Sequence, residues 1–544
     1  MGTLAAVTRW ATALVVLACL FLAACGGSSH RRHAHGHQVV VAGVLISTGG
    51  PYRWLVKTEG AQPTVAVENR QPGTTAWRLS GPLRQVGGLA RGDVIGYVAK
   101  EAVRVGQTER IYVSAPGSNT VRIRIFRMGW YGGKGGREVL VSRPRKLVTQ
   151  PACAHSFTTG LTQCAWHPTL TFVIPSALPT GIYIAKLSAP TGESDCLFVV
   201  LAARPQPLLA QLPTSTYEAY NAWGGDSLYP GGADRVRITG TNQGVEVSYQ
   251  RPYDSDTGAG QFFARDVAMI RFLERYGYPV SYTTGESVDQ DPGQLAGHKA
   301  VIDFGHSEYW SQKQAAAFAR TRDEGTSLLF LGSDTLAWRV RYARASRGAS
   351  DRGAPDQTII AYKQFAARDP DRKTQPTGAF PDGGASLTGS AYLGCITPRL
   401  RELGPPTYDY YPWLPGPGLR PSWLYAHTHM TSATEVFGIV GYELDTTTPA
   451  TPPDTQVVGT GYAPCMGVEA GEPRPGRGDD RAQTTIYTEP SGAIVFNTGT
   501  LGWELGLEPV PSASPNAPRK PNPFVVAMTR NLLAHVLAIP GHRA

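Results

Sequence analysis

The stretch at residues 299–311 (KAVIDFGHSEYWS) constrains the fold more than any other part of the sequence. Its apolar run, 300–304, has the length and bulk of a buried strand. Gly305 then permits a sharp turn, and His306 and Glu308 follow at the carboxyl end of the strand. Because residues two apart in an extended chain share a face, these two side chains are expected to lie together.

A helix and a second strand are predicted directly after this stretch. Ser311 and Gln314 have the spacing of a capping box, which predicts a helix to about residue 324. Residues 326–331 (TSLLFL) are typical of a buried strand. The pattern is a β-α-β unit, and in open α/β sheets ligands bind outside the carboxyl ends of the strands. We therefore look for chemistry next to His306.

Length and charge limit the classes of protein to consider. A chain of 544 residues is too long for one core, so two or three domains are expected. The 62 glycines and 43 prolines indicate many turns and a large β component. The net charge of +9 is spread along the chain without a long Lys/Arg run, so nucleic-acid binding is not expected.

The N-terminus has the features of an export signal. Arg9 precedes an apolar stretch, 11–24, that is too short for a comfortable membrane span. It ends in LAACG, which is similar to a bacterial lipobox. We expect a lipoprotein signal peptide at 1–24, a lipid on the thiol of Cys25 and a His/Gly/Ser tether at 25–38. The protein would then be held at the outer face of the cytoplasmic membrane; the alternative is an ordinary signal peptide with a chance cysteine.

The remaining cysteines suggest one disulfide. Cys153 and Cys164 bracket a short loop, and an exported protein meets an oxidising compartment. Cys395 with Cys465 is a weaker pairing, and one cysteine is left over. Since the sequence has no C-x-x-C pair, a thiolate zinc site is not expected.

Residues 39–203 are predicted to form a β-sandwich domain. Short strands recur there between Gly/Pro turns, a spacing typical of sandwiches. The strands are expected at 64–68, 94–99, 110–114, 121–126, 170–174, 182–187 and 196–201. The Gly-rich aromatic turn at 127–137 is interpreted as a structural hairpin or an interface with the next domain, because no helix pattern follows it.

Residues 204–544 are predicted to form a layered α/β domain. Helices are expected at 261–275 and 522–538, and strands at 279–283, 436–444, 456–460 and 494–497. Strand–helix alternation favours a largely parallel sheet. The Gly-, Pro- and Asp-rich part at about 345–435 is interpreted as an excursion over this sheet, such as a lid. The fold class is thus multidomain α+β.

A family resemblance rests on six ordered motifs, which are YNAWGGDSLY, VSYQRPY, GHSEYWS, FLGSDTLAWRVR, GYELD and FNTGTLGWELGL. They cover about residues 215–507 and resemble the large (beta) subunit of N,N-dimethylformamidase and its bacterial relatives. The resemblance implies a glutamine-amidotransferase-like α/β domain and a mononuclear, ferric iron held by two tyrosines and one glutamate. Glu308 matches the glutamate directly.

The tyrosine ligands carry over from the resemblance as Tyr220 of YNAWGG and Tyr253 of RPY, with Tyr217, Tyr229 and Tyr249 as alternatives. A tyrosine in an aromatic cluster is more often a core residue than a ligand, and Glu308 alone would suit a helix N-terminus. The motif match shifts both expectations toward a metal site. Phenolate and carboxylate oxygens are hard anionic ligands that suit Fe(III).

Three further residues are expected around the metal. The resemblance implies roles for His306 and for Glu443 of GYELD, and the physical role open to both is moving a proton to the departing amine. Asp334 stands where the family tends to have asparagine, which adds a charged group next to the substrate. A metal that polarises an amide carbonyl or acidifies a bound water would complete the chemistry.

The sequence therefore predicts an iron-dependent hydrolase that cleaves C–N bonds of small amides. The alternative is a non-enzymatic surface protein that binds a glycan or an envelope partner on the same scaffold. A serine hydrolase with Ser307 as nucleophile is disfavoured, because Tyr309 replaces the second glycine of G-x-S-x-G. The substrate, and whether a second copy or a small partner subunit is needed, are left open.

Overall fold

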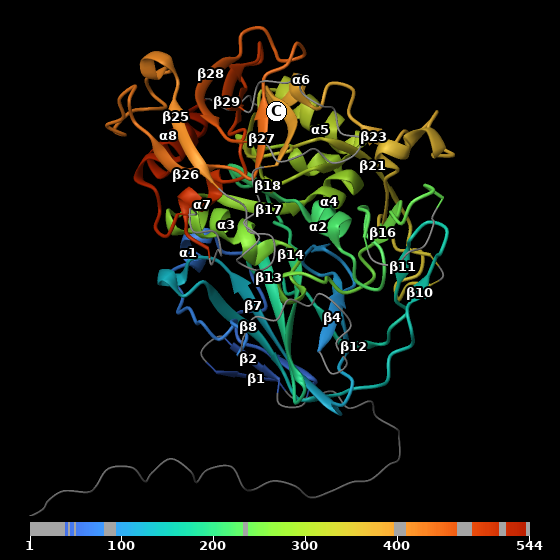
Figure 1. The fold of residues 1–544 in the computed structure, drawn as a ribbon. Coiled ribbons are helices and arrows are strands. Elements are labelled where there is room, and N and C mark those ends of the chain that lie inside the picture. The colour runs from blue at the N-terminus through green and yellow to red at the C-terminus, as the bar shows by residue number, and fades with distance from the viewer. Residues whose placement is uncertain are drawn as a thin grey trace, which may run out of the picture.

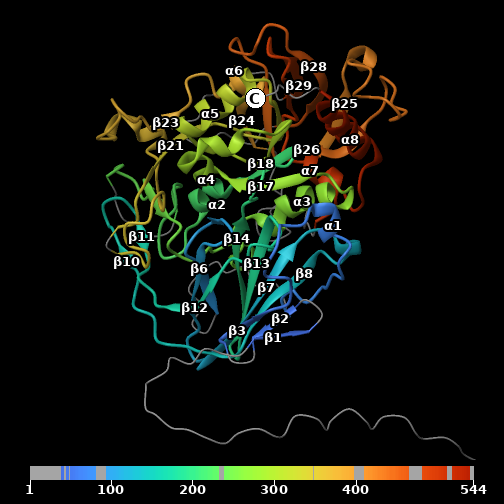
Figure 2. The same cartoon turned by 180° about the vertical axis from the view of Figure 1, so that it is seen from behind.

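The computed structural model describes residues 38–41, 44–47, 50–80, 94–231, 238–346, 348–396, 410–464, 481–510 and 518–539. The predicted signal peptide, Cys25 and most of the tether lie outside these ranges. Strands dominate the N-terminal part, drawn in blue and teal, and helices and strands alternate in the part that follows (Figures 1 and 2). The chain is a mixed α+β protein with several sheets. No helix in the described ranges has both the length and the apolar character needed to cross a bilayer.

Two sheets of the N-terminal part enclose one hydrophobic core. The larger has the strand order β3 (Tyr52–Trp54), β8 (Gly136–Ser142), β7 (Thr120–Met128), β13 (Gly181–Ala189), β14 (Gly192–Val200), β5 (Ala102–Val103), with β9 (Arg145–Lys146) beside β7. The smaller has the order β12 (Pro168–Val173), β6 (Thr108–Ser114), β4 (Ile95–Val98). Ile111 and Val113 of the smaller sheet share a buried cluster with Ile123 and Ile125 of the larger one.

The central strands of the larger sheet are buried on both faces. Along β13, Tyr183 and Ala185 join the core between the two sheets, whereas Ile182 and Ile184 join a cluster shared with the C-terminal part. Because neither face meets water there, the first five residues of the strand, 181–185, are a continuous apolar run and do not alternate with polar residues. The N-terminal sheet is thus the support on which the second part of the chain packs.

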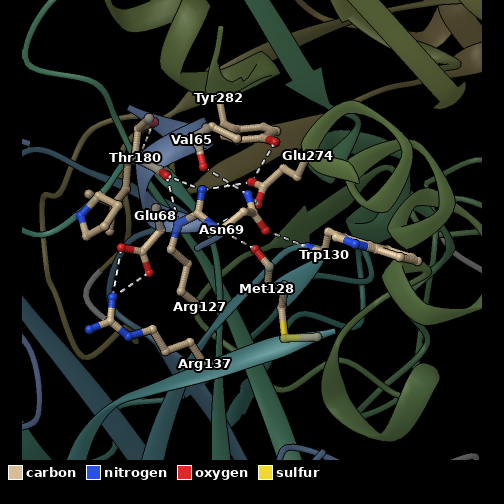
Figure 3. Close-up of polar contacts among 12 residues, drawn as sticks. Val65, Glu68, Asn69, Arg127, Met128, Trp130, Arg137, Thr180, Glu274 and Tyr282 are labelled. Carbon is tan, nitrogen blue, oxygen red and sulfur yellow. Dashed lines mark hydrogen bonds and ion pairs between the residues drawn. The ribbon is translucent and has the colours of Figure 1, made fainter. Parts of the chain in front are cut away.

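A buried ion pair crosses this contact (Figure 3). Arg127, at the end of β7, donates to both carboxylate oxygens of Glu274 at 2.7 and 2.9 Å, and neither side chain is exposed. Its remaining hydrogens reach the carbonyl of Thr180 and the hydroxyl of Tyr131. Tyr282 and Asn69 also donate to Glu274. The pair is fully hydrogen-bonded, as a buried charge must be.

The C-terminal part is built on a nine-stranded mixed sheet. Its order is β17 (Val280–Thr284), β15 (Leu208–Leu212), β18 (Ala300–His306), β20 (Ser327–Ser333), β30 (Ile494–Asn497), β29 (Arg481–Thr488), β28 (Gln456–Tyr462), β25 (Tyr411–Pro415), β26 (Val436–Val440). Strands β17 to β30 are parallel and the rest antiparallel. The sequence predicted β17, β18, β20 and β30 of the parallel half but not β15, and it did not predict β25 and β29.

Smaller sheets surround this one. A five-stranded sheet contains β16 (Glu246–Ser248), β22 (Thr358–Ile360), β21 (Trp338–Ala343), β19 (Tyr309–Ser311) and β23 (Gly378–Ala379). Three strand pairs complete the described part: β1 (Gln38–Val41) with β2 (Val44–Ser47), β10 (Ala154–His155) with β11 (Thr162–Gln163), and β24 (Ala391–Ile396) with β27 (Glu443–Thr446). The predicted strand at 436–444 is therefore two strands, β26 and β27, in two different sheets.

The helices are α1 (Val65–Glu68), α2 (Thr214–Tyr220), α3 (Val267–Arg275), α4 (Gly285–Gln290), α5 (Gln312–Asp323), α6 (Ala385–Thr388), α7 (Trp503–Leu507) and α8 (Pro523–Ala538). The predicted cap of α5 is confirmed, since the Ser311 hydroxyl accepts from the Gln314 N–H at 2.9 Å. The expected strand at 64–68 is wrong. Thr64 instead accepts a hydrogen bond from Val67 N–H and starts a short helix.

The disulfide between Cys153 and Cys164 is present, as predicted. Cys196 is buried and reduced. The other predicted pairing, Cys395–Cys465, falls on side chains outside those that the structure describes.

Candidate metal centre

The candidate centre lies at the carboxyl ends of two parallel strands. In the register of β18 and β20, His306 is paired with Ser333, so Glu308 and Asp334 emerge at the same edge of the sheet. Asp334 has a left-handed backbone with φ of 54°. Asp445 of β27 fixes this turn, because its Oδ1 accepts from the Ser333 hydroxyl at 2.7 Å and from the Asp334 N–H at 2.8 Å.

Three carboxylates face one nitrogen of His306. Its Nε2 lies 3.0 Å from Glu443, 3.3 Å from Asp334 and 3.3 Å from Glu308. All four side chains are buried. The single hydrogen on Nε2 can point at only one of these acceptors, so two of the three carboxylates receive no hydrogen from His306. His306, Asp334 and Glu443 each offer a ligand atom, these atoms lie within 4.8 Å of one another, and the three could hold a metal ion.

Three tyrosines converge on the other side of Glu308. The Tyr229 hydroxyl lies 2.7 and 2.9 Å from the two Glu308 oxygens, 2.8 Å from the Tyr220 hydroxyl and 2.7 Å from the Tyr309 hydroxyl. The rings of Tyr220 and Tyr229 are stacked, with centroids 4.3 Å apart. Four oxygens thus lie within 2.9 Å of the Tyr229 hydroxyl oxygen, and phenol and carboxylate oxygens are ligands that suit a hard cation.

Lys363 covers the tyrosine cluster and was not found by sequence reasoning. Its ammonium lies 3.4 Å from the centroid of the Tyr229 ring and 5.0 Å from that of Trp338, and the side chain is only 4% exposed. The residue has a left-handed backbone, φ 49°, within the stretch interpreted as an excursion. A single lysine in a Gly/Pro-rich segment carries no signal of such a role in the sequence.

Tyr442 and Arg265 complete the wall next to His306. The Tyr442 hydroxyl lies 3.3 Å from Nδ1 of His306, and the Arg265 guanidinium stands 4.3 Å from the Tyr442 ring centroid. Arg265 comes from a π-helical turn, Phe262–Asp266, that precedes α3. Tyr442 belongs to the GYELD motif, so the motif pointed to this place although only Glu443 was singled out.

Burial and neighbouring charges set the protonation states. Burial opposes ionisation of Glu308, but hydrogen bonding from His306 and the charge of Lys363 hold the pKa of its carboxyl below the usual value. Burial, and then the charge of Glu308, raises the pKa of Asp334 well above the usual value. Burial opposes protonation of His306, yet the charge of Glu443 raises the pKa of the imidazole. A protonated Asp334 has the shape of an asparagine side chain and, like it, can donate a hydrogen bond, although with one hydrogen where the amide has two.

Five of the six predicted site side chains meet here, and Tyr253 does not. The Tyr253 hydroxyl donates to Glu101 at 3.1 Å, and its ring packs against Tyr217. The reason is local: the neighbouring Arg251 is held by Glu218 and by carbonyls of the 221–226 loop, which aims the following residues at the N-terminal sheets. Of the alternatives kept open, Tyr229 takes the place of Tyr253.

Tyr217 and Tyr249 stay apart from the cluster. The Tyr217 hydroxyl donates to Asp266. The Tyr249 hydroxyl is buried without a hydrogen-bond partner among the described residues. Ser307 is not paired with His306 either, because its hydroxyl donates to Asp303 at 2.8 Å and contacts the Trp310 indole. This arrangement does not support a serine nucleophile.

The residues present fit an iron ion. Phenol and carboxylate oxygens from Tyr220, Tyr229 and Glu308 lie within hydrogen-bonding distance along one chain of contacts, and they are hard ligands. One oxygen of Asp334 is buried without a hydrogen bond within the described part of the chain, and the Glu443 oxygen that lies 3.0 Å from Nε2 of His306 makes an ion-pair contact but no aligned hydrogen bond. Such oxygens require a cation, a proton or water.

Comparison with known proteins agrees with the motifs. No curated protein matches the chain. A β-glucuronidase from Faecalibacterium prausnitzii is similar at 11% identity with a TM-score of 0.10, over 44% of this chain and 41% of that one, and this similarity carries no inference. The model of the family described as N,N-dimethylformamidase beta subunit-like, C-terminal, matches residues 122–518. The chain therefore belongs to the N,N-dimethylformamidase beta subunit-like family.

Proposed function

We propose that the protein is an iron-dependent hydrolase that cleaves the C–N bond of small amides, with Tyr220, Tyr229 and Glu308 as the iron ligands. Membership of the family implies a hydrolase acting on amides. The observation that carries the proposal is the convergence of the Tyr220 and Tyr229 hydroxyls with the buried carboxylate of Glu308, whose oxygens all lie within 2.9 Å of the Tyr229 oxygen.

The chemistry divides between an ion and the surrounding side chains. A ferric ion bound there would act as a Lewis acid toward the amide carbonyl or a water. Hydrolysis adds hydroxide to the carbonyl carbon and a proton to the leaving nitrogen. His306 carries that proton on Nε2, and Glu443, 3.0 Å away, accepts or returns it. Lys363 offsets the negative charge that develops beside the tyrosines.

The first test measures bound iron in the wild-type protein, in two variants of the proposed ligands and in one control variant. Tyr229→Phe and Glu308→Gln keep the shape of each side chain but remove a ligand oxygen or its charge. We expect the purified wild-type protein to contain about one iron per chain and to show a visible phenolate-to-iron band, and both variants to lose most of the iron and the band.

Tyr253→Phe is the matched control, because it makes the same chemical change, the loss of a phenol hydroxyl, at a tyrosine that lies outside the cluster. It should keep iron, colour and activity on small amides such as dimethylformamide. A colourless wild-type protein that takes up no added iron would contradict the proposal and favour the non-enzymatic binding protein.

We also infer that the enzyme is a lipoprotein at the outer face of the membrane, with a β-sandwich at 39–203 and a glutamine-amidotransferase-like domain at 204–544. The support for the anchor is the LAACG motif before Cys25. Cys25→Ser should move the full-length protein from the detergent phase to the aqueous phase in a Triton X-114 partition. Equal partition of both proteins would exclude the anchor.

A further inference from the structure

A pocket of about 440 Å³ lies far along the main sheet from the metal centre. Its lining includes Thr488 and Ile494, at the junction of β29 and β30. Val495 pairs with Leu328 near the start of β20, whereas Asp334 follows the end of that strand. The pocket therefore opens at the amino edge of the parallel strands, and the candidate metal centre at their carboxyl edge.

Strand register builds the floor of this pocket. Gln456 pairs with Ile486, and Thr488 pairs with Ile494. Residues directly opposite each other in antiparallel strands share a face, and so do residues two apart. All four side chains therefore rise from the same face of the sheet: two buried isoleucines between two exposed polar groups.

Helix α8 and the turn at 421–426 form the wall. The ring of His535 lies parallel to the indole of Trp423, with centroids 3.9 Å apart and an interplanar angle of 3°. Asn531, one turn earlier in α8, donates to the carbonyls of Leu424 and Ala426 at 2.9 and 2.7 Å. These bonds fix the turn on the helix, so the aromatic wall is preformed.

The hydrogen-bonding groups at the rim are unused. The side chains of Asp454, Gln456 and Thr488 are exposed, line the pocket and make no hydrogen bond within the described residues. Partial burial lowers the pKa of His535, so its ring is neutral at pH 7. Asp454 is thus the one charged side chain among the lining residues, and an anionic ligand would be repelled.

We propose that this pocket binds a neutral sugar unit. The apolar C–H face of a pyranose packs on an indole and on isoleucine side chains, while its hydroxyls need a carboxylate, an amide and a hydroxyl as partners. An organic cation would instead require several open aromatic faces, and His535 already covers one face of Trp423. The proposal is independent of the hydrolase activity.

Ligand-observed NMR of the whole protein tests this proposal. The probes are glucose, mannose, galactose, N-acetylglucosamine and their β-1,4-linked disaccharides, with choline as the cationic competitor. We expect saturation transfer to at least one sugar and none to choline. Gln456→Ala combined with Thr488→Ala, both at exposed positions, should weaken binding about tenfold or more through two lost hydrogen bonds.

Two further variants complete the design. Trp423→Ala should abolish the transfer, and Tyr462→Ala, an exposed aromatic on the same strand as Gln456, should leave it unchanged. Absence of transfer to every sugar, transfer to choline in their place, or sugar binding that survives the double variant would each overturn the proposal.

Discussion

Asp445 joins the two sequence segments that supply the acids of the centre. It stands two residues after Glu443 in β27, and its carboxylate holds the turn that presents Asp334 to His306. The side chain is 1% exposed, and Asn497 also donates to it. A buried acceptor of this kind fixes positions and does not itself need to touch the substrate.

Replacing Asp445 therefore tests positioning. Asp445→Ala leaves the Asp334 N–H and the Ser333 hydroxyl without their acceptor, which should lower the free energy of unfolding by about 1–3 kcal/mol. Displacement of Asp334 should lower kcat on a small amide by about 10- to 100-fold. Asp445→Asn keeps one acceptor oxygen and should recover most of both quantities. An Asn variant as impaired as the Ala variant would show that charge, not position, matters.

At the scale of single residues, the sequence predicted the strand-borne groups, kept the loop-borne Tyr229 only as an alternative and missed Lys363. His306, Glu308 and Asp334 follow apolar runs whose ends are visible in the sequence. Tyr229 and Lys363 reach the centre from irregular segments, where no periodic sequence pattern predicts which way a side chain points. Tyr253 was placed at the centre by its motif, but the contacts of Arg251 turn it toward Glu101.

At the scale of elements, strand β7 and helix α3 are joined by Arg127 and Glu274. Arg127→Met would leave a buried carboxylate without its cation, and the free energy of unfolding should fall by about 3–5 kcal/mol. The measurement is urea unfolding followed by tryptophan fluorescence.

A second arginine provides the matched control. Arg104 pairs with Asp291 across the same two parts of the chain at 2.8 Å, but these side chains are 42% and 57% exposed. Arg104→Met should cost no more than about 1 kcal/mol. Equal losses in the two variants would mean that the Arg127 pair does not stabilise the contact as described.

The elements predicted best are those whose apolar pattern agrees with local signals. Helices α3, α5 and α8 and strands β18 and β20 were expected from period and caps, and they form. The short helix α1 was mistaken for a strand, because Val65 and Val67 favour strands while the Thr64 cap decides the backbone. Strand β29 was missed, since its partners β28 and β30 lie beside it only in the folded sheet.

At the scale of the whole molecule, buried carboxyls make stability depend on pH. Burial of Glu109 raises the pKa of its carboxyl from the usual 4.5 to about 8, despite hydrogen bonds from the N–H groups of Ala99 and Arg110. Between pH 4.5 and about pH 8, the Glu109 carboxyl of the folded protein holds a proton that the same carboxyl of the unfolded chain has lost. Stability from this group is therefore full below pH 4.5 and is lost as the pH rises toward 8.

Glu109→Gln tests this dependence. The variant has no proton to lose, so its urea midpoint should fall less than that of the wild type between pH 5 and about pH 8. Glu59→Gln, at an exposed position, should keep the wild-type slope. A Glu109→Gln variant with the wild-type slope would show that this carboxyl is not the source.

The central claim is that oxygens of Tyr220, Tyr229 and Glu308 hold one iron ion. The most direct measurement is an anomalous difference map from crystals of iron-loaded protein, collected on both sides of the iron absorption edge. The account predicts a single strong peak between these three side chains, within bonding distance of all of them. A peak beside Tyr253, or no peak in protein that hydrolyses amides, would contradict it.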